Sequence, residues 1–112
     1  MRIWHAFRYS AAGLRSAVRH EAAFRQELAL GLPLVGLAAW LAPGRWQMLV
    51  MVGSIVLVWI VELLNSAIEA LADALSVEHH PLLGRAKDLG SAAVMFSLVL
   101  VVLAWTTALW PS

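Results

Sequence analysis

The chain has 112 residues, of which 62% are hydrophobic and 13% charged, and its formal net charge is +1. A water-soluble domain of this length cannot bury so large an apolar fraction, because small domains have a high surface-to-volume ratio. The composition therefore predicts a single domain, residues 1–112, that contacts lipid or other subunits over much of its surface. The small net charge gives no sign of nucleic-acid binding, and the absence of cysteine excludes disulfides and thiolate metal sites.

Residues 1–27 are expected to form an amphipathic helix, because apolar residues recur at spacings of three and four. The apolar positions are Ile3, Phe7, Ala11, Leu14, Val18 and Ala22. Four arginines mostly lie elsewhere on this helix, and Trp4 precedes Phe7 at its start. A basic helix with aromatic residues is typical of the membrane interface, where its apolar side enters the acyl boundary. A soluble helix packed on a partner is the alternative.

Three apolar stretches follow and predict an all-α membrane protein with three transmembrane helices. Residues 28–42 carry no charge but are short for a span of roughly 20 residues, and Pro33 should kink or loosen this helix. Pro43 and Gly44 predict a turn. The second span begins at residue 46, and its helix should continue past the membrane to about residue 75. Residues 89–110 carry no charge and form the third span; the core helix of a soluble protein is the alternative there.

The basic residues predict the orientation of the chain in the membrane. Seven of the eight Lys and Arg precede the first span or lie in the second loop, and only Arg45 lies in the first loop. Because basic residues are retained on the cytoplasmic side, the N-terminus and the second loop are expected to be cytoplasmic. Trp40, Trp46 and Trp110 would then form an aromatic belt at the opposite interface.

Polar residues gather at the end of the second span. Glu62, Asn65, Glu69 and Asp73 share one face of a helix that turns 100° per residue. A carboxylate near hydrocarbon costs roughly 2.5–3.5 kcal/mol, so such residues are retained where they face protein, a cation or water. Glu62 follows a long uncharged run and is therefore the strongest candidate for a functional role. Ordinary solvation beyond the membrane is the alternative for Glu69 and Asp73.

The second loop contains a further group of polar residues. Its two adjacent histidines cannot easily bind one metal ion from a helix, whereas Arg85 and Lys87 could hold phosphate oxygens. The alternative is that Arg85 and Lys87 bind no phosphate and only mark the cytoplasmic side of the membrane, where basic residues are retained. Oxygen ligands beside basic residues are typical of a magnesium-nucleotide site. Because the sequence has none of the standard phosphate-binding or kinase motifs, phosphoryl transfer would need a different kind of site. Three spans cannot enclose a rigid pocket by themselves, which favours an oligomer with shared sites.

Three blocks of sequence closely resemble the bacterial integral-membrane diacylglycerol kinase family. They are residues 21–27 (EAAFRQE), 61–70 (VELLNSAIEA) and 84–94 (GRAKDLGSAAV). The resemblance implies a homotrimer of the bacterial inner membrane that transfers the γ-phosphoryl group of MgATP to diacylglycerol, giving phosphatidate. It also implies that the site lies between subunits at the cytoplasmic interface.

The resemblance implies a role for each matching residue. Glu62 would be the general base that takes the proton of the lipid hydroxyl, and Asn65 would help to hold that geometry. Glu21 and Glu69 would hold the magnesium ions that bridge the ATP phosphates. The other residues expected to contact the nucleotide are Arg2, Tyr9, Glu78, His79, His80, Lys87 and Asp88. The lipid side would be lined by Glu62 together with Ser10, Arg15, Arg25, Gln26, Trp40 and Ser91.

Two departures from the family pattern leave a second acceptor open. The chain has Ala11-Ala12 where diacylglycerol kinases commonly carry Trp-Lys, and the dipeptides at 8–9 and 80–81 resemble the undecaprenol kinase branch. Undecaprenol is therefore the alternative acceptor. A small proton-coupled transporter that uses Glu62 is a weaker alternative, because the far half of each span is almost wholly apolar. A non-catalytic assembly subunit would not explain the carboxylates that share one face with Asn65.

Overall fold

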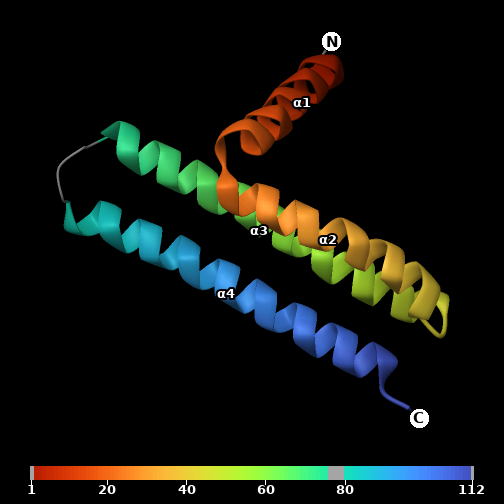
Figure 1. Cartoon of the computed structure of the whole chain (residues 1–112). Coiled ribbons are helices and arrows are strands. Elements are labelled where there is room, and N and C mark those ends of the chain that lie inside the picture. Colours follow the sequence, from red (N-terminus) through yellow and green to blue (C-terminus); the bar gives the residue numbers. More distant parts are fainter. Residues whose placement is uncertain (1, 76–79, 112) are drawn as a thin grey trace.

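The computed structural model describes residues 2–75 and 80–111, and these residues form helices and no strand. The helices are α1 (Arg2–His20), α2 (Ala22–Leu41), α3 (Arg45–Leu75) and α4 (Pro81–Leu109). Helices α2, α3 and α4 run side by side in alternating directions, and α1 projects away from them (Figure 1). The all-helical fold expected from the sequence is confirmed.

Helix α3 packs against both α2 and α4. Two tryptophan side chains form hydrogen bonds between α3 and these neighbours. The Nε1–H of Trp59 donates a hydrogen bond to the backbone oxygen of Glu27 on α2, at 3.0 Å. The Nε1–H of Trp105 on α4 donates to the backbone oxygen of Met51 on α3, at 3.1 Å. Gly31 permits the close approach of α2, because a Cβ added there would lie 2.6 Å from a ring carbon of Trp59. These contacts fix both outer helices against α3.

The first helix ends earlier than expected. The periodicity predicts one helix over residues 1–27, but α1 ends at His20, and α2 begins at Ala22. Glu21 between them has an extended backbone, with φ −109° and ψ 104°. The guanidinium of Arg25 donates hydrogen bonds to the backbone oxygens of Val18 (3.1 Å) and Arg19 (3.2 Å). Because these oxygens lie in the last turn of α1 and lack partners within the helix, Arg25 stabilises the bend.

The other helix limits follow local capping rules. Helix α3 agrees with the predicted segment 46–75 to within one residue. Helix α4 begins at Pro81, ahead of the apolar stretch predicted at 89–110. Proline is favoured at the first helical position, and the ring nitrogen Nδ1 of His80 accepts the backbone N–H of Leu82 at 3.2 Å. Pro33 does not end α2, which continues to Leu41.

Two of the helices are long and apolar enough to cross a membrane. They are α3, with 31 residues and a mean hydropathy of 2.2, and α4, with 29 residues and a mean hydropathy of 2.3. Helix α2 does not meet the same criterion in the described part of the chain, so the first predicted span, residues 28–42, stays a prediction. Most apolar side chains of α4 are exposed in the single chain, including Phe96 and Val102. Such a surface indicates a membrane protein.

Candidate functional site

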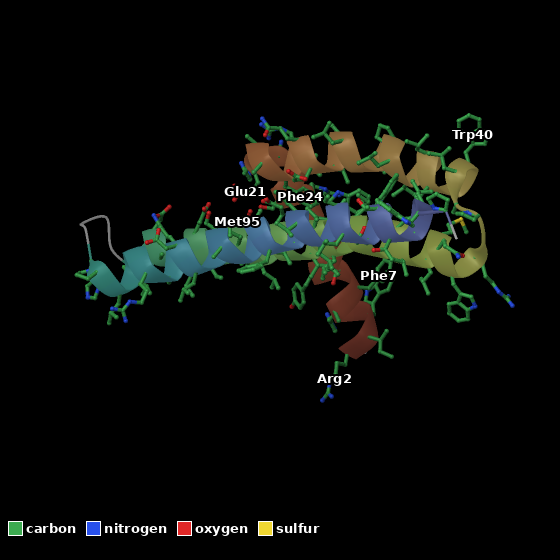
Figure 2. The ribbon with its side chains drawn as sticks, turned by 90° about the horizontal axis from the view of Figure 1, so that it is seen from below. Arg2, Phe7, Glu21, Phe24, Trp40 and Met95 are labelled. Atoms are coloured by element: carbon green, nitrogen blue, oxygen red, sulfur yellow. The ribbon has the colours of Figure 1, made fainter. Side chains whose placement is uncertain are left out.

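A cavity of about 260 Å³, here called the carboxylate pocket, lies where the start of α2 meets the middle of α3 and α4. Its lining residues are Glu21, Ala22, Ala23, Glu62, Asn65, Ser66, Glu69, Ser91 and Val94. Figure 2 shows Glu21 and Phe24 at the start of α2, on the side that faces α3 and α4. The pocket therefore collects polar groups from three helices.

Helical periodicity explains how α3 supplies the largest share of the lining. Glu62, Asn65, Ser66 and Glu69 are separated by three, one and three residues, so they lie on one face of α3. Glu62 is only 5% exposed, which is rare for a carboxylate. Glu62 is therefore enclosed by the protein at a polar cavity, whereas Glu69 on the same face is exposed in the single chain.

Glu21 reaches the pocket because the chain bends at this residue. It occupies the position before the first residue of α2, where Ser, Thr, Asp or Asn side chains often cap a helix. Its carboxylate makes no such capping bond. The group is therefore not used by its own helix and lines the same cavity as Glu62 and Glu69.

The amide of Asn65 has an unusual environment. Its oxygen Oδ1 is buried and has no hydrogen-bond partner in the described part of the chain, although buried polar atoms are almost always paired. Gly90 of α4 lies directly against this oxygen, at a place where a Cβ atom would overlap it. Asn65 therefore lines the cavity while its amide oxygen packs against α4.

The oxygen atoms of the pocket fit a magnesium ion of the kind that accompanies a nucleotide. Within residues 2–75 and 80–111, no three His, Asp or Glu side chains form a group that could hold a metal by themselves. Mg²⁺ is usually bound by one or two carboxylates, with water and substrate phosphates as its other ligands. Glu21 and Glu69 provide carboxylates of that type around one cavity.

A positive charge lies one helical turn beyond the pocket. The ammonium Nζ of Lys87, which precedes the predicted span 89–110, is 2.6 Å from a carboxylate oxygen of Asp73. Asp73 accepts a hydrogen bond from this ammonium and also attracts its charge, so the pKa of Lys87 is raised above its ordinary value. Both side chains are substantially exposed. Lys87 therefore stays protonated beside the pocket at neutral pH.

A second cavity, of about 650 Å³ and here called the α1 cavity, lies between α1 and α3. Its lining residues are Ser10, Gly13, Leu14, Ser16, Ala17, His20, Glu21, Leu63, Ser66, Ala67 and Ala70. Most of its surface is apolar or formed by small residues. Glu21 and Ser66 line both cavities, so the α1 cavity adjoins the carboxylate pocket.

The predicted site residues divide into two groups. Five of them line the carboxylate pocket, namely Glu21, Glu62, Asn65, Glu69 and Ser91, and Ser10 lines the α1 cavity. The predicted residues that line neither cavity are Arg2, Tyr9, Arg15, Arg25, Gln26, Trp40, His80, Lys87 and Asp88. Arg2 lies near the free end of α1, and Trp40 lies at the end of α2 remote from Glu21 (Figure 2). Glu78 and His79 lie outside the described residues.

Two residues at the pocket were absent from the predicted site. Ser66 lines both cavities, and its spacing of four residues from Glu62 was a usable signal. Gly90 contacts Asn65 across the α3–α4 interface. A glycine inside a helical stretch gives no local sign of such a contact, because the contact depends on how two helices pack.

Comparisons with known proteins give one consistent result. A family model described as "Prokaryotic diacylglycerol kinase" matches residues 8–109. A diacylglycerol kinase from Escherichia coli (strain K12) is 48% identical over 109 residues, which cover 97% of this chain and 89% of that protein. Similar relatives with the same name come from Pseudomonas aeruginosa, at 46% identity over 96% and 88%, and from Helicobacter pylori, at 40% identity over 93% and 81%.

Proposed function

Because this chain belongs to the prokaryotic diacylglycerol kinase family, we propose that it transfers the γ-phosphoryl group of MgATP to diacylglycerol and so produces phosphatidate. The observation that carries this proposal is the carboxylate pocket, whose lining contains Glu21, Glu62, Glu69 and Asn65. Phosphoryl transfer depends chiefly on positioning and on neutralising charge. A cavity lined by oxygen ligands beside Lys87 meets both needs.

Glu62 is the proposed general base. The hydroxyl oxygen of the lipid forms a bond to the γ-phosphorus while the bond from that phosphorus to the β–γ bridging oxygen breaks. The hydroxyl proton passes to the carboxylate of Glu62, and ADP leaves. Asn65 lies three residues further along the same face of α3, where its amide can orient the acceptor hydroxyl or the base.

Glu21 and Glu69 are the proposed ligands of Mg²⁺. When bound, the metal neutralises phosphate charge during the transfer. The two carboxylates come from different helices but line one cavity, so they can bind a single metal-nucleotide unit. Lys87 adds a fixed positive charge one turn beyond Glu69, where it can contact phosphate oxygens.

We further propose that the protein acts as a homotrimer with shared sites. The other expected nucleotide contacts, Arg2, Tyr9, His80 and Asp88, do not line the pocket of their own chain. Arg2 in particular lies at the far end of the projecting helix α1 (Figure 2). Contacts from these residues therefore need a neighbouring subunit or a different position of α1. The exposed apolar surface of α4 offers room for such neighbours.

The membrane arrangement that we propose has three spans and a cytoplasmic N-terminus in the inner membrane. The 20 residues of α2 give a length of about 30 Å at 1.5 Å per residue, which matches the hydrocarbon thickness of a typical bilayer. Helix α1 would then lie at the cytoplasmic interface, since Ile3, Phe7 and Leu14 are all more than half exposed in the single chain. The α1 cavity, with Ser10 in its wall, is the proposed side of lipid entry.

The test is a transfer assay with the detergent-purified protein, labelled ATP, Mg²⁺ and either diacylglycerol or undecaprenol. We expect the label in phosphatidate, and label only in the polyprenyl product would instead support the alternative acceptor. Glu62→Gln should bind MgATP but lose about 100-fold or more in kcat. Ser54→Ala is the matched control, because Ser54 is another buried polar residue of α3 whose hydroxyl donates to the backbone oxygen of Met51. Normal turnover by Glu62→Gln, or no transfer by the unmodified protein, would contradict the proposal.

A further inference from the structure

At the carboxylate pocket, Gly90 of α4 lies directly against the side chain of Asn65 of α3. A Cβ atom added at Gly90 would overlap the amide oxygen of Asn65 and lie 3.3 Å from its Cγ atom. The next neighbour, Cδ1 of Ile68, would be at 3.6 Å, which is an ordinary contact distance. The side chain of Asn65 is therefore the only severe obstacle to a larger residue at this position in the described structure.

The amide oxygen of Asn65 packs against α4 at this place. This oxygen has no hydrogen-bond partner in the described residues and is fully buried. A polar side chain that lacks such bonds keeps its orientation only where neighbouring atoms leave no other space. Gly90 provides the space that the amide oxygen occupies, and the adjacent residue Ser91 lines the pocket.

We propose that Gly90 is a positioning residue, whose missing side chain keeps the Asn65 amide at the wall of the carboxylate pocket in the orientation that the reaction requires. This inference rests on the proposed function, because it assigns Gly90 a role through a residue of that site. Gly90 itself has no polar side chain with which to contact a substrate.

A methyl group at position 90 can be accommodated in only two ways. Either the Asn65 amide turns away from α4, or α4 moves away from α3. The first change moves the amide oxygen out of its present place, and the second carries Ser91 and Val94 away from the opposite wall of the pocket. Both changes alter the reacting geometry, so a Gly90→Ala variant should lose turnover in either case.

Three glycine variants provide the kinetic test. Gly36 and Gly53 are helical glycines whose added Cβ atoms would meet nothing within 4 Å. We expect Gly90→Ala to lower kcat by about 10- to 100-fold, since a small misplacement of a positioned group has effects of this size. The KM values for MgATP and lipid should change less than about threefold, because the carboxylates and Lys87 are retained. Gly36→Ala and Gly53→Ala should keep kcat within about twofold of the unmodified protein. An unchanged kcat in Gly90→Ala, or equal losses in all three variants, would overturn the proposal.

A double-mutant cycle on thermal stability tests the same contact without any turnover. Gly90→Ala should lower the Tm when Asn65 is present and should have no such effect in the Asn65→Ala background, because the obstructing amide is then gone. Equal Tm changes in the two backgrounds would refute the inference. If Gly90→Ala alone does not fold, recovery of folding in the double variant supports the contact, and its failure refutes it. The Tm cycle also separates the two hypotheses, since an unmodified protein without kinase activity would contradict the proposed function while leaving this contact measurable.

Discussion

Gly31 gives the most direct test of how α2 is fixed against α3. A Cβ atom added there would lie 2.6 Å from Cζ2 and 2.8 Å from Nε1 of Trp59, and 2.9 Å from Cγ2 of Ile55. Distances this short cannot persist, so the Gly31→Ala variant must separate the helices or turn the indole ring. Turning the ring removes the 3.0 Å hydrogen bond from Trp59 to the backbone oxygen of Glu27. The substitution thus disturbs both packing and a hydrogen bond.

The expected change in the free energy of unfolding is the sum of three effects. Replacing a helical glycine by alanine stabilises the chain by about 0.5–1 kcal/mol. Overpacking at the interface destabilises it by about 1–3 kcal/mol, and loss of the indole hydrogen bond by about 0.5–1.5 kcal/mol. The unfavourable effects win, and Gly31→Ala should lose about 2 kcal/mol of stability.

Gly36→Ala is the matched control on the same helix. A Cβ atom added at Gly36 would meet nothing within 4 Å, so only the favourable helix effect remains, and stability should rise by up to about 1 kcal/mol. Unfolding in detergent can be followed by the near-ultraviolet circular dichroism of the tryptophans. If both variants shift the unfolding midpoint in the same direction, the close approach of α2 to α3 at Gly31 is refuted.

Three further predictions concern other contacts of the fold. Trp59→Phe and Trp105→Phe each remove one interhelical hydrogen bond, so each variant should lose about 1 kcal/mol of unfolding free energy. Only Trp59→Phe should lower kinase activity, because Trp105 lies far along α4 from the pocket. Equal kinase activity in the two variants would contradict this. The pKa of Lys87 is raised by Asp73, so their ion pair stabilises the folded chain at neutral pH and is lost as the pH rises through that raised value. The stability difference between Asp73→Asn and the unmodified protein should therefore be present at neutral pH in low salt and vanish in strongly alkaline buffer; a difference that persists there has another cause. Mg²⁺ should raise the Tm of the unmodified protein, and removing the metal with a chelator should reverse the change. The Tm of Glu69→Gln should respond to Mg²⁺ much less. An equal response of the two proteins would exclude Glu69 as a metal ligand.

The elements that depend on local periodicity could be predicted from the sequence. Helix α3 has the expected limits to within one residue, and the residues from Glu62 to Glu69 that share one face line one cavity. The early start of α4 was missed because hydropathy marks where a membrane span begins rather than where a helix begins. The signals for that start, Pro81 preceded by the capping residue His80, were present in the sequence.

Features that depend on packing could not be predicted. The bend at Glu21 has no glycine or proline at that point, and Arg25, which stabilises it, was expected on the lipid side of the site. The pairing of Lys87 with Asp73 depends on the register between α3 and α4. The same register brings Gly90 of α4 against Asn65 of α3. It is set by how the two helices pack, which the periodicity of either helix alone does not reveal.

The charge of the pocket and the apolar surface of the chain favour the same kind of assembly. Among the described residues, the pocket is lined by three carboxylates and by no Lys, Arg or His, and the nearby Lys87 is paired with Asp73. Like charges around one cavity repel each other, so bound metal, or arginines outside the pocket such as those on α1, would stabilise these carboxylates. Helix α4 packs against α3 on one side and leaves many of its other apolar side chains exposed, so other copies can pack there without displacing the contacts with α3. A neighbouring copy would bring its own basic helix to the same interface. We therefore favour a shared site, since one arrangement then supplies positive charge to the carboxylates and covers apolar surface that the single chain leaves exposed.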